Sequence, residues 1–380
     1  MRIVQLGCGS VGYAIAYAFA EDKVDVEYEI YDFSRLNLAK CAALPLNTVH
    51  YEALDLSQED NIKYALRNAD LVIEALPATL GFKVMNISSI MCKNVISISY
   101  TREDPLILDE NYKRCKRLLI PDAGFAPGIS NIVVGRLISL LDRIESIKIY
   151  VGGIPEKPIG PLGYSITWSV EDLLDEYVRP ARIIENNEIK YVDPLSSVEI
   201  VNIPYFNEFE AFYTDGLRTM LHTIRNKVKH AFEKTLRYKG HVEKIRLLRD
   251  LGLLDIEPIT LEGKTVVPRN VLATLMNKKL RFPGVKDLAI LYIDAVGYVN
   301  NEKKEYEYLI WSKYDEKRDL SAMAKTTGFT AYAIARAVID NIIDEIHGVI
   351  PPEILGMKEN IFTYIMSILV EKDIHLKILD

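Results

Sequence analysis

Residues 2–12 of this 380-residue chain are RIVQLGCGSVG, and this stretch decides the fold of the N-terminal part. The apolar run Ile3–Leu6 predicts a strand, and Gly7, Gly9 and Gly12 follow it at once, before an alanine-rich helical run. In a dinucleotide-binding unit the first glycine makes the tight turn, the second lets the backbone approach a pyrophosphate, and the third lets the helix pack on the strand. The stretch therefore predicts a phosphate-binding turn.

The helix after this turn is predicted to begin at Ser10 and Val11, so their free N–H groups and the positive end of the helix dipole would face the phosphates. Asp32 ends the second predicted strand, where a carboxylate accepts hydrogen bonds from an adenosine ribose. A carboxylate there repels a 2′-phosphate, which favours NAD over NADP, although Arg35 could pair with that phosphate. We expect NAD as the cofactor, with NADP as the alternative.

Two further pairs of residues follow predicted strands at the edge where ligands bind in parallel sheets. Asp55 and Leu56 come after the third strand and are predicted to flank the adenine, and Leu76 and Pro77 come after the fourth and are predicted to face the phosphate or the nicotinamide ribose. The alternative for each pair is a turn residue and a core leucine.

Short apolar strands alternate with helical stretches over the first 120 residues, which is typical of an α/β fold with a doubly wound parallel sheet. The predicted strands are Ile3–Leu6, Val26–Asp32, Thr48–Leu54, Leu71–Ala75, Val95–Ser99 and Arg117–Ile120. We expect a Rossmann domain over residues 1–124.

The chain changes character after a predicted helix at Ile129–Leu141. Long alternating strands at Glu145–Val151 and Ala289–Val299, and a hairpin turn at Asn186-Asn187, predict an α+β substrate domain with a mixed or antiparallel sheet over residues 125–325. Residues 326–380 are predicted to be helices that return to the Rossmann domain, with breaks at residues 326–328 and 351–352.

The net charge of −7 repels nucleic acid and anionic lipid, so neither is expected as a partner. No apolar run is long enough to cross a bilayer, and the N-terminus lacks the pattern of a signal peptide, so we expect a cytoplasmic protein. The four cysteines are scattered without a Cys-x-x-Cys pair or clustered histidines. This spacing predicts reduced thiols, with no metal site and no disulfide framework.

Residues 122–131 (DAGFAPGISN) resemble a signature of the saccharopine dehydrogenase-like family. Further blocks resemble in particular its archaeal-type L-lysine 6-dehydrogenases: 150–155 (YVGGIP), 168–169 (WS), 176–181 (EYVRPA), 214–218 (TDGLR), 236–241 (LRYKGH) and 349–356 (VIPPEILG). Lys239 departs from the proline usual in the fifth block, which loosens the turn before His241. The resemblance implies a Rossmann domain, a substrate domain that often forms a homodimer, and an amino-acid substrate.

The family-like blocks supply candidates for the chemistry. A substrate carboxylate needs a guanidinium, for which Arg179, Arg218 and Arg237 are candidates.

Oxidation next to an amine requires that the amine lose its proton, and Asp122, His241 and Tyr177 are the candidate catalytic groups. Each of these residues has a structural alternative, such as a surface ion pair, a helix cap or a core histidine.

These observations favour oxidative deamination of L-lysine at C6 as the function. A saccharopine or carboxynorspermidine dehydrogenase is the alternative within enzymes, and a catalytically inactive nucleotide-binding scaffold is the alternative of another class.

Overall fold

In the computed structural model, which describes residues 1–167, 169–206, 208–343 and 346–379, the chain divides into two compact units. Unit 1 contains residues 1–141 and 315–375, and unit 2 contains residues 142–314 and the end of the chain from residue 376. These boundaries differ from the predicted ones at 124/125 and 325/326, because helix α6 (Ile129–Leu140) and the start of helix α11 (Ala322–Ile339) both belong to unit 1.

Unit 1 is built on a parallel sheet that has seven strands in the described part of the chain, in the order β17-β6-β5-β4-β1-β2-β3. The strands are β1 (Arg2–Leu6), β2 (Glu27–Asp32), β3 (Thr48–Ala53), β4 (Leu71–Glu74), β5 (Asn94–Ser97), β6 (Leu118–Ile120) and β17 (Gly348–Val349). The order from β3 to β6 is that of a Rossmann domain, with its switch point beside β1. Each of the six predicted strands is present within two residues of its predicted ends, and the prediction missed only the short β17.

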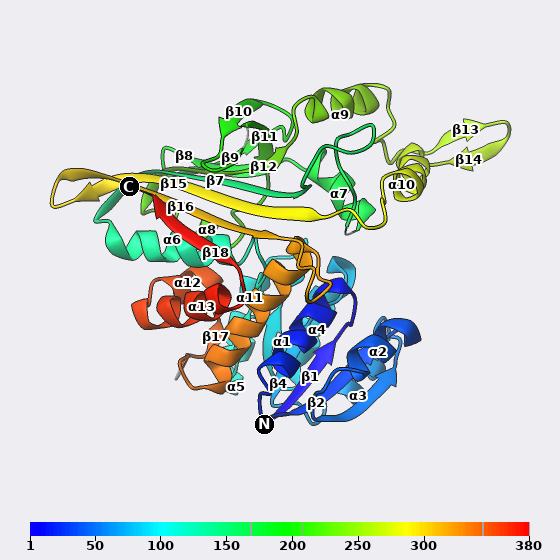
Figure 1. The fold of residues 1–380 in the computed structure, drawn as a ribbon, viewed down its shortest axis with the longest axis vertical. Helices are drawn as coiled ribbons and strands as arrows, with labels where there is room; N and C mark the ends of the chain where they lie inside the picture. The colour runs from blue at the N-terminus through cyan, green and yellow to red at the C-terminus, as the bar shows by residue number, and fades with distance from the viewer. Residues whose placement is uncertain (168, 207, 344–345, 380) are drawn as a thin grey trace. The chain divides into compact units, whose positions relative to one another are not determined.

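Helices cover the parallel sheet, as Figure 1 shows for the blue, cyan and orange segments. The helices of this unit are α1 (Ser10–Glu21), α2 (Arg35–Ala42), α3 (Glu59–Leu66), α4 (Ala78–Ile90), η1 (Pro105–Leu108), α5 (Asp109–Cys115), α6, α11, α12 (Pro352–Gly356) and α13 (Glu359–Glu371). Of these, α6, α12 and α13 pack on one another, and α13 also packs on α11. One hydrophobic core of this unit consists of strand and helix residues such as Val4, Leu66, Val95 and Tyr112.

Helix α11 packs along α1 and runs without interruption through residues 326–328, so the predicted break there is wrong. The hydroxyls of Thr326 and Thr330 bond back to the carbonyls of Ala322 and Thr326, which satisfies these polar groups inside the helix. A side chain at Gly328 would come within 2.8 Å of the Cβ of Ala14. The glycine is therefore needed for close helix packing and does not end the helix.

The cysteines contradict the sequence prediction. The structure joins Cys8 to Cys41 and Cys92 to Cys115 in disulfides, with Cα atoms 6.5 and 5.3 Å apart. All four lie in unit 1, and βα packing brings together residues that are 33 and 23 positions apart. The expectation of four reduced thiols is therefore wrong. It failed because the spacing of cysteines in the sequence does not show which of them lie close together in the fold.

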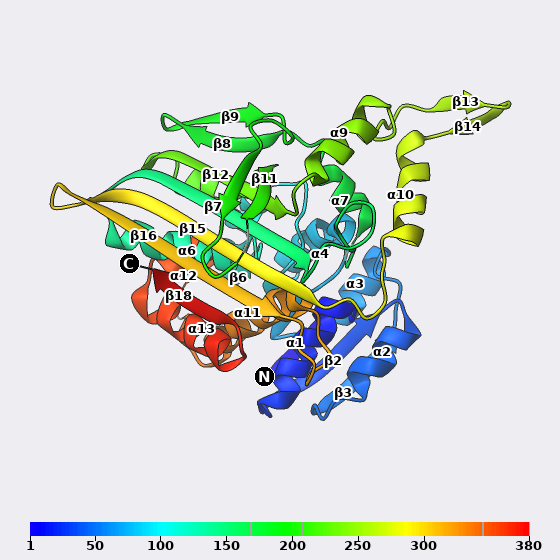
Figure 2. The same ribbon diagram turned by 45° about the horizontal axis from the view of Figure 1, so that its top comes forward.

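Unit 2 contains a mixed sheet, in the order β10-β11-β12-β7-β15-β16-β18, with β8 and β9 attached to β12. The strands are β7 (Arg143–Pro155), β8 (Ala181–Glu185), β9 (Glu188–Val192), β10 (Glu199–Asn202), β11 (Glu208–Thr214), β12 (Val228–Arg237), β15 (Asp287–Val299), β16 (Glu302–Lys313) and β18 (His375–Leu379). Strand β12 is parallel to β7, whereas the pairs β11–β12, β7–β15 and β15–β16 are antiparallel. Figure 2 shows the long strands β7, β15 and β16 side by side.

The described part of unit 2 also contains four helices and a small hairpin: α7 (Val170–Glu176), α8 (Met220–Thr223), α9 (His241–Asp250), α10 (Pro268–Lys279), and the strands β13 (Ile259–Leu261) and β14 (Lys264–Val266). The predicted turn at Asn186 and Asn187 is confirmed, since both residues have positive φ between β8 and β9. The end of the chain differs from its predicted helical role, because β18 pairs with β16.

Candidate cofactor and substrate sites

The glycine turn in unit 1 has the geometry that a dinucleotide requires. A side chain at Gly7, whose φ is +96°, would overlap the carbonyl of Ala75, and one at Gly12 would overlap the carbonyl of Gly7. A side chain at Gly9 would meet no atom within 4 Å, so the backbone is open to a ligand there. The amide of Gln5 holds the turn by donating to the carbonyls of Gly7 and Gly12 at 2.8 and 2.9 Å.

Helix α1 begins at Ser10 and continues through Val11, so the free N–H groups of its first turn follow this open backbone. Asp32 is buried at the end of β2, and its carboxylate accepts hydrogen bonds from the backbone N–H of Cys8 at 2.5 Å and of Ser34 at 2.6 Å. Asp32 thus fixes the glycine turn to β2. It also places a negative charge where the sequence predicts the ribose contact.

The other cofactor candidates differ in exposure. Asp55 is exposed, and hydrogen bonds from Ser57 lower the pKa of its carboxyl. Leu56 is buried in the hydrophobic core that contains Val4 and Tyr112, which favours its structural alternative. Leu76 is half-buried against the same core, and the exposed Pro77 precedes the first residue of α4.

Glu74, the buried last residue of β4, was not predicted from the sequence. Its carboxylate accepts hydrogen bonds from the hydroxyls of Ser97 and Ser99 at 2.5 and 2.8 Å and from the N–H of Leu76 at 2.7 Å, and burial raises its pKa. Glu74 fixes the turn that carries Leu76 and Pro77. Its position at the carboxyl end of a strand was the signal that could have identified it.

Asp122 lies in unit 1, two residues after β6, and is 1% exposed. Its φ of +52° is unusual for a residue other than glycine, although Asp is among the types that tolerate it. The following segment contains a cis peptide between Ala126 and Pro127. The structure thus places Asp122 with the predicted cofactor residues in unit 1, whereas His241 and Tyr177 belong to unit 2.

His241 and Tyr177 form a buried pair in unit 2. His241 Nδ1 lies 2.9 Å from the carbonyl of Leu162, and its Nε2 lies 2.9 Å from the hydroxyl of Tyr177. Because a carbonyl only accepts, Nδ1 carries the proton and the tyrosine donates to Nε2. Burial and the nearby Arg237 lower the pKa of His241 to about 3, and burial raises the pKa of Tyr177. A histidine with this pKa and both nitrogens bonded is a poor general base near neutral pH.

The three candidate arginines have different surroundings. Arg179 is partly exposed and pairs with Asp175 at 3.1 Å. Arg218 is buried between β11 and α8, with φ of +50°.

Arg237 is the most enclosed of the three, with 3% exposure at the end of β12. Its guanidinium donates to Glu176 at 3.0 Å and lies 4.4 Å from the ring centre of Tyr164. In the described part of the chain its Nε has no hydrogen-bond partner. Burial raises the pKa of Glu176, while Arg237 opposes this rise.

Tyr164 and Glu233 were not predicted from the sequence as site residues, and Glu176 was noted only as the start of a family-like block. Trp168, from the block at 168–169, lies outside the described residues. The available signal for Glu233 was the spacing of Glu233, Thr235 and Arg237 in one strand, because alternate residues share a face of a sheet.

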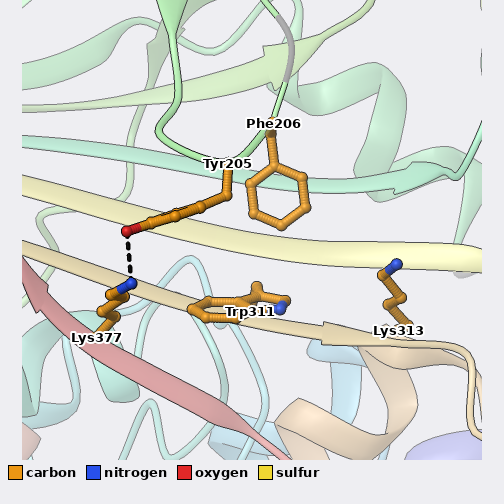
Figure 3. Close-up of a pocket in the computed structure, with 5 residues that line it drawn as sticks. All are labelled: Tyr205, Phe206, Trp311, Lys313 and Lys377. Atoms are coloured by element: carbon orange, nitrogen blue, oxygen red, sulfur yellow. Dashed lines mark hydrogen bonds between the residues drawn. The ribbon is translucent and has the colours of Figure 1, made fainter.

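An open pocket of about 260 Å³ also lies on unit 2, and none of the predicted site residues lines it. Tyr205, Phe206, Trp311, Lys313 and Lys377 line it, and Figure 3 shows Lys377 donating to the hydroxyl of Tyr205. The described residues contain no group of three or more His, Cys, Asp or Glu side chains arranged to hold a metal, and no helix among them is long and apolar enough to span a membrane.

Comparison with known families matches nearly the whole chain. A family model described as the saccharopine dehydrogenase NADP binding domain matches residues 3–119, and one described as the saccharopine dehydrogenase C-terminal domain matches residues 124–374.

Curated relatives are distant in sequence. The alpha-aminoadipic semialdehyde synthase of Arabidopsis thaliana is 23% identical over 81% of this chain and 31% of that protein. The saccharopine dehydrogenase (NADP(+), L-glutamate-forming) of Schizosaccharomyces pombe is 28% identical over 53% of this chain and 47% of its own. The matches thus span less than half of either relative. The carboxynorspermidine synthase of Vibrio cholerae is 24% identical over 88% of both chains.

Solved structures share the fold. Apo saccharopine dehydrogenase (L-Glu forming) from Saccharomyces cerevisiae has a TM-score of 0.80 at 18% identity, with 100% of both chains covered. The homospermidine synthase of Legionella pneumophila, solved in complex with NAD, has a TM-score of 0.66 at 14% identity and covers 100% of this chain and 91% of that one. The predicted fold class, a Rossmann domain followed by a mixed-sheet domain, is confirmed.

Proposed function

The chain belongs to the saccharopine dehydrogenase family, and on that premise we propose that it is a nicotinamide-dependent oxidoreductase that oxidises an amine-bearing carbon of an amino acid. The preferred reaction is oxidative deamination of L-lysine at C6, in which lysine, water and the oxidised cofactor give the semialdehyde, ammonia and the reduced cofactor. The open backbone at Gly9, at the start of a Rossmann helix, is the observation that carries the cofactor part.

The cofactor residues fit a dinucleotide, with NAD as the proposed form. Backbone N–H groups at Ser10 and Val11 hold the phosphates, and Asp32 holds the adenosine ribose. When bound, the nicotinamide supplies the two-electron acceptor. The family model is named for NADP, so the choice of NAD rests on the carboxylate of Asp32 alone.

The amino-acid part rests on Arg237, a buried guanidinium with an unused N–H at Nε. A carboxylate is the natural acceptor for it, since charge-assisted bonds to guanidinium are among the strongest in proteins. The pair of Tyr177 and His241 shapes the buried wall beside Arg237 and stays neutral, so in our proposal it positions the substrate and excludes water. Asp122 is kept as the proposed proton acceptor.

Formation or cleavage of a secondary amine is the second candidate. It is favoured by the match to carboxynorspermidine synthase, which covers most of both chains. An assay that follows reduced nicotinamide with lysine, saccharopine and carboxynorspermidine, each with NAD and with NADP, separates these activities. Turnover of lysine without added 2-oxoglutarate supports the proposal, whereas turnover of saccharopine alone contradicts it. Cofactor binding without any turnover supports the inactive scaffold.

The cytoplasmic location and the homodimer stay predictions from sequence. Light scattering on the purified chain tests the homodimer directly.

A further inference from the structure

One face of strand β12 carries a buried strip of polar side chains, which we call the polar strip: Glu233, Thr235 and Arg237, with Thr214 from the neighbouring strand. The three β12 residues alternate along the strand and are at most 5% exposed. Thr214 lies opposite Glu233 in the antiparallel register, and its hydroxyl is 3.5 Å from Glu233 Oε1 and 3.1 Å from the hydroxyl of Thr235. This is a polar interior in a position where a sheet usually buries apolar side chains.

The polar strip leaves two polar atoms of ionisable side chains without hydrogen-bond partners among the described residues. Glu233 Oε2 and Arg237 Nε are buried and have no hydrogen-bond partner among the described residues. Buried polar atoms in folded proteins nearly always have a partner, so an exception needs an explanation such as a ligand. Glu233 Oε2 can accept a hydrogen bond, and Arg237 Nε can donate one. Together they complement a ligand that carries both a positively charged donor and a negatively charged acceptor.

The charges around Glu233 do not balance within the described residues. Arg237 pairs with Glu176 at 3.0 Å, and Arg182 pairs with Asp215 at 2.8 Å, so each of these carboxylates has a guanidinium. No ion pair joins Glu233 to any side chain that the structure describes. Burial, followed by the negative charges of Glu176 and Asp215, raises the pKa of Glu233 to about 8. A cationic group on a ligand would offset the burial of the Glu233 carboxylate and the repulsion by Glu176 and by Asp215.

Gly216 shows that the backbone makes room for this carboxylate. A side chain at position 216 would overlap the carboxylate group of Glu233. The segment between β11 and α8 therefore passes against Glu233 only because residue 216 has no side chain. Glu233 and Arg237 are four residues apart on one strand, or about 13 Å between Cα atoms. A ligand that reached both side chains would therefore need two charged groups several bonds apart.

We propose that Glu233 binds the distal ammonium group of the substrate while Arg237 binds its carboxylate, which selects amino acids with an aliphatic chain between a carboxylate and a primary amine. This inference rests on the proposed function and deepens it. Saccharopine bears additional carboxylates on its secondary amine, and Glu233 in its ionised form would repel them. Glu233 would thus discriminate between the two candidate substrate classes.

The first test uses the unaltered chain with its cofactor. Norleucine has the carbon chain of lysine without the distal amine, so calorimetric titration with each ligand isolates the contribution of that amine. We expect lysine to bind at least tenfold more tightly than norleucine. Equal affinities would overturn the proposal, whether or not lysine is turned over.

The second test is Glu233→Gln, which keeps the size of the side chain and removes its charge. We expect KM for lysine to rise at least tenfold with a smaller change in kcat. We also expect the rise of kcat/KM toward pH 8, where Glu233 ionises in the unliganded protein, to disappear. Glu233→Asp keeps the charge and should restore part of the affinity. Glu185→Gln is the matched control, because Glu185, at the end of β8, forms an exposed ion pair with Lys190 of β9.

The outcomes separate this inference from the proposed function. If the wild type oxidises lysine but Glu233→Gln leaves KM and the pH profile unchanged, Glu233 is a neutral buried acid, and only the inference fails. If the wild type oxidises no amine while still preferring lysine over norleucine in the titration, the binding role stands and the proposed reaction fails.

Discussion

In the glycine turn of unit 1, Gln5 and Asp32 satisfy the groups that hold the loop, and the backbone at Gly9 is left open. In the polar strip of unit 2, the side chains lack hydrogen-bond partners, because Glu233 and Arg237 each retain a buried polar atom without a partner among the described residues. The first region is a rigid backbone cradle that any dinucleotide can use. The second is a pair of ionisable side chains, and their charges determine which ligand can bind to them.

The largest expected effect is at Gly9. Gly9→Val should reduce the affinity for NAD at least 100-fold, because the side chain would occupy the space through which the pyrophosphate approaches. The free energy of unfolding should change by less than about 1 kcal/mol, since no atom lies within 4 Å of the new Cβ. Calorimetric titration and chemical denaturation measure the two quantities. Unchanged affinity would show that the cofactor does not approach this turn.

The second prediction compares two arginines that were equal candidates in the sequence. Arg237→Met should lower the free energy of unfolding by about 3 kcal/mol, because Glu176 would lose its guanidinium in a largely enclosed site. Arg179→Met should cost less than about 1 kcal/mol, since Asp175 keeps its ion pair with Arg269. Denaturation of both variants gives these values. A larger loss at Arg179 would contradict the assignment of the structural contacts.

The milder Arg237→Lys variant separates binding from folding. A lysine keeps the charge without the planar fork, so KM for the substrate should rise at least fivefold while Arg179→Lys leaves it unchanged. Equal KM values in the two variants would remove Arg237 from the carboxylate site.

The third prediction concerns the acid that was identified from the sequence. Asp32→Ala should reduce the ratio of the Kd for NADP to the Kd for NAD about fivefold, because the ribose contact and the repulsion of a 2′-phosphate disappear together. It should also weaken the binding of both cofactors, since the carboxylate accepts the N–H of Cys8 and holds the turn. Titration with both cofactors gives the ratio. Tighter binding of NADP by the wild type would contradict the choice of NAD.

These regions also differ in how much the sequence could show. The glycine turn was predictable because its chemistry lies within one βα unit, where local spacing fixes the geometry. The polar strip depends on sheet register, which places Thr214 opposite Glu233. The nearby charge of Glu176 comes from a separate helix that packs close to the strip. The disulfide between Cys8 and Cys41 was missed for the same reason, because only the packing of α2 beside the glycine turn brings the two sulfurs together.

The sequence also suggested a role for His241 that its surroundings do not favour. Residue type alone indicates a group that titrates near neutral pH, whereas burial and the charge of Arg237 lower the pKa of His241 to about 3, although the hydrogen bond to the Leu162 carbonyl opposes this. Such surroundings are a property of the folded interior, which residue type does not reveal. The predicted contribution of His241 to the pH dependence of activity is therefore open to direct test.

The smallest expected effect on activity is that of His241→Asn. In the folded chain His241 stays neutral above about pH 3, whereas in the unfolded chain it gains a proton near pH 6.5. The unfolded state thus binds more protons between these values, so the stability of the wild type falls as the pH is lowered from 6.5 toward 3. An asparagine side chain does not titrate in this range, and the variant should lose this part of the slope, which denaturation at a series of pH values detects.

Above pH 6.5 the same variant should keep the shape of the wild-type pH profile for kcat/KM, because a histidine that is neutral throughout that range cannot produce an ascending limb. If His241→Asn flattened the limb near neutral pH while Glu233→Gln left it in place, the proton-accepting role would belong to the histidine. The ionisation of Glu233 in the polar strip would then make no contribution to the pH dependence of kcat/KM.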